Sequence, residues 1–261
     1  MAAVTTEARA PGATGAGGPT AAEVDAVIEQ CAAIVRAKRS SAHPFVAELD
    51  AVAPDRAGIG RWATAKYHQV NLQNVIFSAL HANARDLPDV RHYCVDQLVA
   101  EETHHTSGGS PHYAMMRRLA VACGVTDSML DPVAMRVSPE VRAYVDALIA
   151  ACRDDDVAYG LLTIWSIESQ SGESAGRVLA WLRANHDFTD DELEWFVVHS
   201  EDEDDHAAEG IALVRRLAVD LPDFPIRAPA VVEGICDAWL TLHDHYRSLL
   251  RAPAPSEGVT L

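Results

Sequence analysis

The chain has 261 residues, of which 49% are hydrophobic, and a formal net charge of −17 at pH 7. This length and composition predict one large folded domain with a sizeable core. The negative charge argues against nucleic acid or an anionic membrane surface as a partner. No run of 18 consecutive apolar residues is present, so the sequence predicts no transmembrane helix.

The two ends of the chain are predicted to be tails around a single helical domain at residues 20–252. Residues 1–19 consist mainly of Ala, Gly, Thr and Pro and lack the basic start and apolar segment of a signal peptide, which predicts a disordered tail. Residues 253–261 are expected to form a short flexible tail. The five cysteines are scattered through helical patterns, which indicates reduced core thiols and a cytoplasmic protein.

Apolar residues recur along the domain with the 3.6-residue period of amphipathic helices, and no segment shows the two-residue period of a strand. Pro and Gly residues interrupt this pattern, and Ser138-Pro139 is typical of a helix start. The predicted helices span residues 21–38, 43–52, 57–84, 88–106, 111–123, 138–152, 156–184, 190–218 and 228–250. The sequence therefore predicts an all-α bundle.

The most informative segment is 199–206, where His, Glu and His occupy positions i, i+4 and i+7 of a predicted helix. At about 100° per residue, His199, Glu203 and His206 fall at about 0°, +40° and −20°, on one face. A capping box at Thr189–Glu192 sets the start of this helix, and Glu203 lies in its apolar stripe. An unpaired buried carboxylate costs several kcal/mol, which predicts a metal ion beside the imidazoles. The alternative is that the histidines lie at the helix edge and Glu203 pairs with a basic residue.

The helix predicted at 156–184 contributes a second buried acid, Glu168, in the centre of its apolar stripe. Ser171 continues the same side and is a candidate for substrate contact. The helix predicted at 57–84 has no Asp or Glu, and none occurs between Arg61 and Arg85. Its inward candidates for substrate contact are Lys66 and Gln73.

A third contribution comes from the end of the helix predicted at 88–106. Glu102 fits its buried face better than Glu101, which stays open as an alternative. One arrangement pairs Glu102 with His105, as in the Glu-x-x-His motif of ferritin-like diiron bundles. The other ends the helix at the Gly pair that follows and restarts it with Pro111 as its first residue, which brings His112 to the site.

The order of these residues resembles the haem-oxygenase-like diiron oxidases and oxygenases. The shared pattern is a Glu-Glu pair, a Gly-containing break, a His that starts the next helix, a later Glu, and His-x-x-x-Glu-x-x-His. His43-Pro44-Phe45 and Tyr67-His68-Gln69-Val70 also resemble the opening helices of the wider superfamily, which includes thiaminase II and pyrroloquinoline-quinone synthase. The resemblance implies a haem-oxygenase-like bundle of about seven core helices. It implies as metal ligands and catalytic residues Glu102, His112, Glu168, His199, Glu203 and His206. The family often has Asp at the position of Glu203.

Imidazole and carboxylate ligands suit iron or manganese. We therefore expect two Fe(II) ions, with manganese as an alternative, and dioxygen as co-substrate. The resemblance implies oxidation of a small molecule, and the polar residues around Glu168 favour a small polar substrate such as a free amino acid. The resemblance also implies that N-oxygenating members of the family use a further carboxylate from the helix equivalent to 57–84, and this carboxylate is missing here. We therefore expect C–H abstraction that leads to desaturation or C–C cleavage in a natural-product pathway.

Three alternatives stay open at this point. The first is N-oxygenation of an amino acid amine. The second is a cofactor-free or thiol-dependent hydrolase resembling thiaminase II, with Cys123 or Cys152 as the nucleophile. The third is a non-catalytic iron-binding protein. A homodimer and an external electron donor are further expectations.

Overall fold

The computed structural model describes residues 17–103, 110–131, 137–201 and 203–251, and within 201–206 only the backbone. All regular secondary structure in these residues is helical, so the predicted all-α fold is confirmed. The elements are α1 (Ala21–Ala37), η1 (Ser40–Ala42), α2 (Pro44–Ala47), α3 (Leu49–Val52), α4 (Arg56–Gln73), α5 (Val75–Asn83), α6 (Pro88–Glu102), α7 (His112–Ala122), α8 (Asp127–Leu130), α9 (Pro139–Cys152), α10 (Val157–Asn185), α11 (Glu194–Glu201), α12 (Glu203–Ala218) and α13 (Phe224–Arg251). The predicted tails fall almost entirely outside the described residues.

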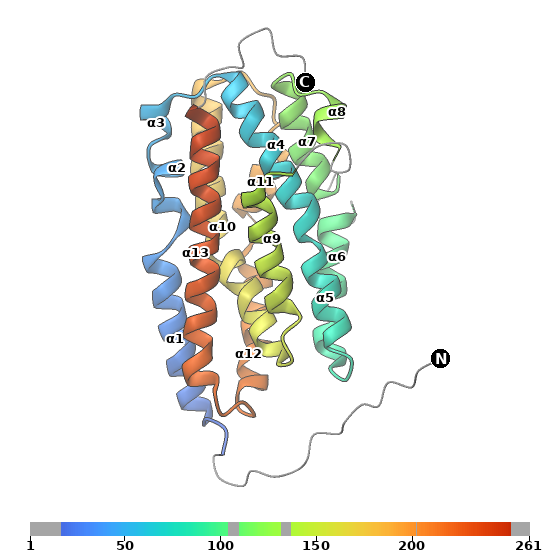
Figure 1. The fold of residues 1–261 in the computed structure, drawn as a ribbon, viewed down its shortest axis with the longest axis vertical. Helices are drawn as coiled ribbons and strands as arrows, with labels where there is room; N and C mark the ends of the chain where they lie inside the picture. Colours follow the sequence, from blue (N-terminus) through green and yellow to red (C-terminus); the bar gives the residue numbers. More distant parts are fainter. Residues whose placement is uncertain (1–16, 104–109, 132–136, 202, 252–261) are drawn as a thin grey trace, which may run out of the picture.

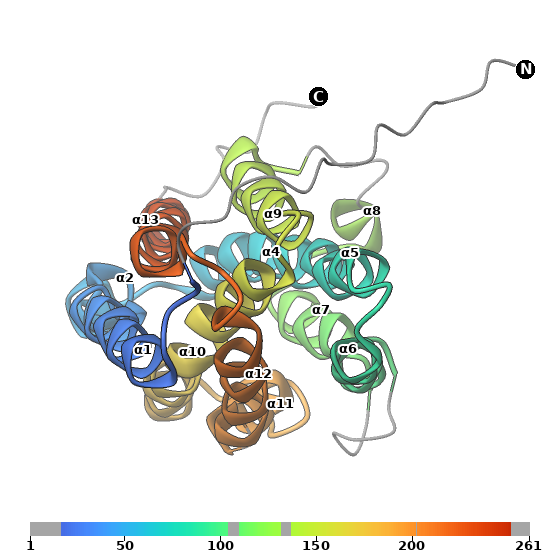
Figure 2. The ribbon, with the colours of Figure 1, turned by 90° about the horizontal axis from the view of Figure 1, so that it is seen from below.

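The long helices run side by side along the long axis of the molecule (Figure 1). Viewed along this axis, α10 lies in the middle of the bundle (Figure 2). It packs against α9, α11, α12 and α13, while α4 packs against α7, α9 and α13. This central position explains why α10 buries residues on nearly every side over its first three turns.

Local sequence signals explain where several helices begin. Thr20 and Glu23 form a reciprocal capping box at the start of α1. The predicted start at Ser138-Pro139 is confirmed, because the Ser138 hydroxyl accepts a hydrogen bond from the Val141 amide at 3.3 Å. The capping box of Thr189 and Glu192 also forms, but regular helix begins only at Glu194.

The structure divides two of the predicted helices, and a third has a residue outside the described part. The segment predicted at 57–84 breaks at Asn74, whose carbonyl accepts a hydrogen bond from the amide three residues on at 3.2 Å. The segment 43–52 forms only short turns of helix, and it ends at Ala53, which has a left-handed φ of 42° before Pro54. The segment 190–218 forms α11 and α12, and residue 202 between them is outside the described part.

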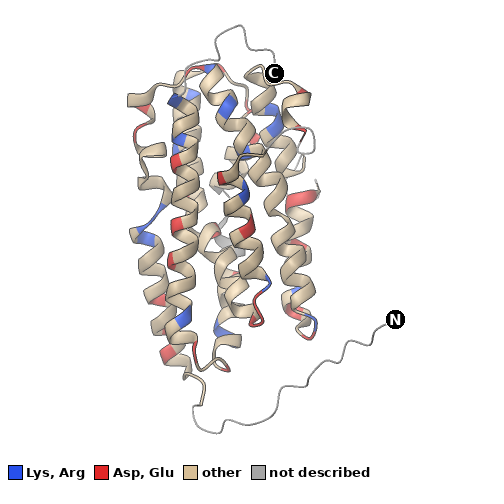
Figure 3. Ribbon diagram, in the orientation of Figure 1, with Lys and Arg blue, Asp and Glu red and all other residues tan. Residues whose placement is uncertain are grey.

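Large buried side chains, including Tyr93, Tyr144, Tyr246 and Phe196, fill the space between the helices. Charged residues are spread over the helices, and the face shown in Figure 3 has no continuous stripe of Lys and Arg. None of the described helices combines the length and the apolar character that crossing a bilayer requires.

Candidate metal centre

Three side chains from three helices form a compact carboxylate and imidazole group. Glu101 comes from α6, His112 from α7 and His199 from α11, and one ligand atom from each lies within 4.8 Å of the other two. The closest pair is His112 Nδ1 and Glu101 Oε2 at 2.9 Å, and the two imidazole ring centroids are 4.6 Å apart. Such a spacing allows all three atoms to contact one metal ion.

Helix ends place two of these side chains. Glu101 precedes the last residue of α6, and its side chain is only 15% exposed. His112 is the first residue of α7, where Pro111 fixes the backbone at the helix start, and it is buried. The end of α6 and the start of α7 therefore bring a carboxylate and an imidazole together.

His199 is oriented by Trp195, one helical turn earlier. Its Nδ1 lies 2.7 Å from the Trp195 carbonyl oxygen, and the two rings stack with centroids 3.8 Å apart. Because a carbonyl can only accept, Nδ1 carries the hydrogen and Nε2 keeps its lone pair. Burial, and then the neighbouring His112, hold the pKa of His199 well below its usual value. The ring is therefore neutral at pH 7, which is the form that binds metals.

Glu168 lies on the central helix α10 and lines a cavity that Glu101 and His199 also line. The Tyr93 hydroxyl donates to Glu168 Oε2 at a long 3.4 Å. Burial, and then the charge of Glu168, raise the pKa of Tyr93 well above its usual value, so this phenol stays protonated. Gly210 on α12 leaves room for it, since a Cβ there would lie 3.2 Å from the Tyr93 oxygen.

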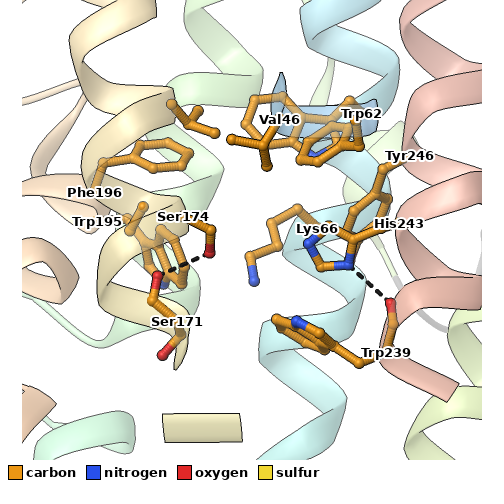
Figure 4. Close-up of a pocket in the computed structure, with 13 residues that line it drawn as sticks. Val46, Trp62, Lys66, Ser171, Ser174, Trp195, Phe196, Trp239, His243 and Tyr246 are labelled. Carbon is orange, nitrogen blue, oxygen red and sulfur yellow. Dashed lines mark hydrogen bonds between the residues drawn. The ribbon is translucent and has the colours of Figure 1, made fainter. Parts of the chain in front are cut away.

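The cavity beside this group, here called the metal cavity, is lined by residues of α4, α5, α6, α10, α11 and α13. Its polar lining residues are Lys66, Gln69, Gln73, Glu101, Glu168, Ser171 and His199. The three side chains proposed from the sequence as substrate contacts, Lys66, Gln73 and Ser171, are among them. A second cavity, the aromatic chamber, is lined by Phe45, Val46, Trp62, Ser174, Ala175, Val178, Phe196, His243 and Tyr246 (Figure 4). It shares Lys66, Ser171, Trp195 and Trp239 with the metal cavity.

Of the remaining candidates from the sequence, the structure turns Glu102 away from this group and does not describe the side chains of the others near it. Glu102 is exposed, and Glu101 stands in its place because the helical phase at the end of α6 turns Glu101 inward. The side chains of Glu203 and His206 lie outside the described residues, and so does His105 with the ferritin-like alternative. The single helical face predicted for residues 199–206 stays a prediction.

The donor set fits iron or manganese better than structural zinc, because it combines a carboxylate with imidazoles and contains no thiolate. The thiols do not offer another catalytic centre. Burial raises the pKa of Cys123 and of Cys152 to about 12, so neither is ionised near neutral pH. This argues against the thiol-dependent hydrolase alternative.

Two residues that shape the site were missed in the sequence. Trp195 contacts His199 and lines both cavities, and Tyr93 contacts Glu168. The i−4 position of Trp195 relative to His199 was a usable signal, because a residue one turn earlier lies on the same helical face. Tyr93 carried no signal, since its partner is 75 positions away.

The fold and the carboxylate and imidazole group together define an all-α protein with a candidate non-haem metal centre. Residues 60–241 match the model of a family described as iron-containing redox enzymes, and the chain belongs to this family. This assignment makes the chain an oxidoreductase and implies iron and a small-molecule substrate.

Similar proteins support the same assignment. The 4-aminobenzoate synthase of Chlamydia muridarum is 26% identical over 218 residues, which cover 82% of this chain and 89% of that protein. The 4-aminobenzoate synthase of Chlamydia trachomatis is also 26% identical, with 82% and 91% covered. Among solved structures, a CADD-like protein from Nostoc punctiforme shares the fold with a TM-score of 0.69 at 14% identity, over 88% of this chain and 100% of that chain. A TenA homologue from Pyrococcus furiosus has a TM-score of 0.61 at 17% identity, over 86% and 99%. These two structures show the haem-oxygenase-like fold.

Proposed function

We propose that this protein is a non-haem diiron oxidase or oxygenase that uses dioxygen to oxidise a small polar substrate. The observation that carries the proposal is the group of Glu101, His112 and His199 at the wall of a cavity that also contains Glu168. Family membership indicates that the metal is iron, because the matching family consists of iron-containing redox enzymes.

In this proposal the ligands are Glu101, His112, Glu168, His199, Glu203 and His206, with Glu101 in place of Glu102. Iron held by these residues supplies the activation of dioxygen. The chain contributes neutral imidazoles and acidic side chains at fixed positions. The Trp195 ring packs against His199 and shields it from water. The Tyr93 hydroxyl stays protonated and donates a hydrogen bond to Glu168.

The substrate we propose is a free amino acid or a similar small molecule, attacked at a C–H bond to give desaturation or C–C cleavage. In the described part of α4, Lys66, Gln69 and Gln73 face the metal cavity, and none of them is a carboxylate. This composition supports C–H attack over N-oxygenation. An external electron donor and a homodimer belong to the same proposal.

Anaerobic titration with Fe(II) tests the metal content, with two ions per chain expected. Dioxygen consumption is then measured with each member of an amino acid panel. One ion or none per chain would contradict the dinuclear site. Deuterium at the attacked carbon should slow product formation, whereas a hydroxylamine or nitro product without an isotope effect would favour N-oxygenation.

A second candidate is the formation of 4-aminobenzoate, which is the activity named for the two chlamydial relatives. The aromatic lining of the chamber beside the metal cavity favours it, because such walls can hold a planar ring. Mass spectrometry for 4-aminobenzoate in the reaction of the iron-loaded protein with dioxygen, a reductant and each member of the amino acid panel tests this candidate.

A further inference from the structure

Lys66 is an unusual residue in this sequence and in this position. Only two of the 21 basic side chains are lysines, Lys38 and Lys66. Lys38 lies at the surface and pairs with Glu233 and Asp237. Lys66 lies in the middle of α4 and is only 7% exposed. Lysine is rarely buried to this extent unless it has partners, so the groups around its ammonium determine what it can bind.

The ammonium group of Lys66 lies where the two cavities meet. It is 4.3 Å from the centroid of the Trp195 ring and 5.4 Å from that of Trp239, and all three residues line both cavities. Figure 4 shows the amine between these two indoles, directed toward the side on which Ser171 and Ser174 lie. The two cation–π contacts hold the charge at this junction.

The charges around the junction are distributed unequally. Among the described residues that line the aromatic chamber there is no Asp or Glu, whereas Glu101 and Glu168 line the metal cavity. His243 adds no second positive charge to the chamber, because burial lowers its pKa to about 3. An anionic ligand is therefore attracted to Lys66 and, in the metal-free protein, repelled from the two carboxylates.

We propose that Lys66 binds the carboxylate group of the substrate at the junction of the two cavities, with the aromatic or apolar part of the substrate in the aromatic chamber. A carboxylate here adds a charge-assisted hydrogen bond in a largely buried site. The rings of Phe45, Trp62 and Tyr246 provide apolar contact for the remainder of the molecule. The carbon atoms next to the carboxylate then face the metal cavity. The substrate class is thus a small carboxylic acid with a bulky apolar side chain, oxidised near its carboxylate end.

This inference rests on the proposed function, because it takes the cavities as the substrate site. Its test uses neither iron nor dioxygen, so failure of metal loading does not decide it. The probes are 3-phenylpropanoate and its amide, 3-phenylpropanamide, which differ mainly in the negative charge. Calorimetric titration of the metal-free protein should show the carboxylate binding about tenfold to a hundredfold more tightly than the amide.

Three variants assign that preference to one side chain. Lys66→Met keeps the length of the side chain without the charge and should bind the two probes equally. Lys66→Arg should keep part of the preference, and Lys38→Met, the same substitution at the other lysine, should keep all of it. Circular dichroism checks that each variant is folded.

A measurement on the unaltered chain covers the case in which Lys66→Met does not fold. Because the sequence has two lysines, labelling with [13Cε]lysine gives two signals, which Lys38→Met assigns. Adding 3-phenylpropanoate should shift the Lys66 signal and leave the Lys38 signal in place. Equal binding of acid and amide by the unaltered chain, no binding of either, or an unmoved Lys66 signal would each overturn the proposal.

Discussion

The metal cavity and the aromatic chamber share Lys66, Ser171, Trp195 and Trp239, yet the chain builds them in different ways. The acidic and imidazole side chains of the metal cavity come largely from helix ends and from the short helix α11. The walls of the chamber come mainly from the long helices α4, α10 and α13. The positions of the helix boundaries therefore determine which residues form the candidate metal centre. Apolar periodicity within the long helices determines which residues line the chamber.

Exchanging a single carboxylate at the end of α6 tests this dependence on helix boundaries most strongly. Glu101→Gln keeps the shape of the side chain and removes its charge, so iron affinity and substrate-dependent dioxygen consumption should fall by more than about a hundredfold. Glu102→Gln, one residue on and exposed, should leave both nearly unchanged. Metal analysis and an oxygen electrode measure the two effects. Equal losses in the two variants would show that the helical phase does not select the ligand.

A similar comparison applies to the acidic run that starts α12. From the i, i+4, i+7 spacing, Glu203→Ala should abolish dioxygen consumption, because it removes a ligand. Asp205→Ala should leave iron content and turnover nearly intact, because this residue is predicted to project to another side. Similar activity in both variants would show that Glu203 is not a metal ligand.

The aromatic chamber should respond to pH through folding stability. The pKa of His243 is held at about 3 in the fold, far below its usual value, because the ring is buried. As pH falls below about 6.5 the unfolded chain takes up this proton and the folded chain does not, so stability falls. The loss is at most about 1.4 kcal/mol per pH unit for this group and continues toward pH 3. Urea unfolding of the metal-free protein between pH 7 and 5 measures the slope. His243→Gln should flatten it, and an unchanged slope would assign the effect to other groups.

The smallest effect is expected at the contact between Tyr93 and Glu168. Their hydrogen bond is long, at 3.4 Å. Tyr93→Phe should therefore lower the free energy of unfolding by about 1 kcal/mol or less and leave the iron stoichiometry unchanged. Thermal unfolding and metal analysis check both expectations. If the Tyr93→Phe variant bound one iron ion fewer per chain, the Tyr93 hydroxyl would be needed to hold Glu168 in place as a ligand.

Most of the fold could be predicted from the sequence, because amphipathic periodicity and capping residues act over one or two helical turns. Helices at 21–38, 138–152 and 156–184 agree with α1, α9 and α10 to within a residue at either end. The breaks at Asn74 and at Glu48, between α2 and α3, were missed, since neither has a Pro or Gly at the break itself. They depend on packing between distant segments.

The candidate site could be predicted in part. The pairing of the α6 end with His112 followed from the order of residues, and the structure brings these segments together. The choice between adjacent Glu101 and Glu102 could not be made, because a shift of about 100° in helical phase near a helix end is within the uncertainty of any stripe. The junction at Lys66 forms only where α4, α11 and α13 pack together, and no local sequence pattern indicates it.

Trp195 gives the molecule a built-in optical reporter. Its indole packs against a proposed iron ligand and lies beneath the ammonium at the cavity junction. Iron at His199 should quench its fluorescence, and a ligand at Lys66 should shift its emission wavelength. The chain has five tryptophans, so the difference between the unaltered protein and a Trp195→Phe variant isolates this signal. Metal loading and substrate loading would then be followed in one cuvette, without a dye or a label.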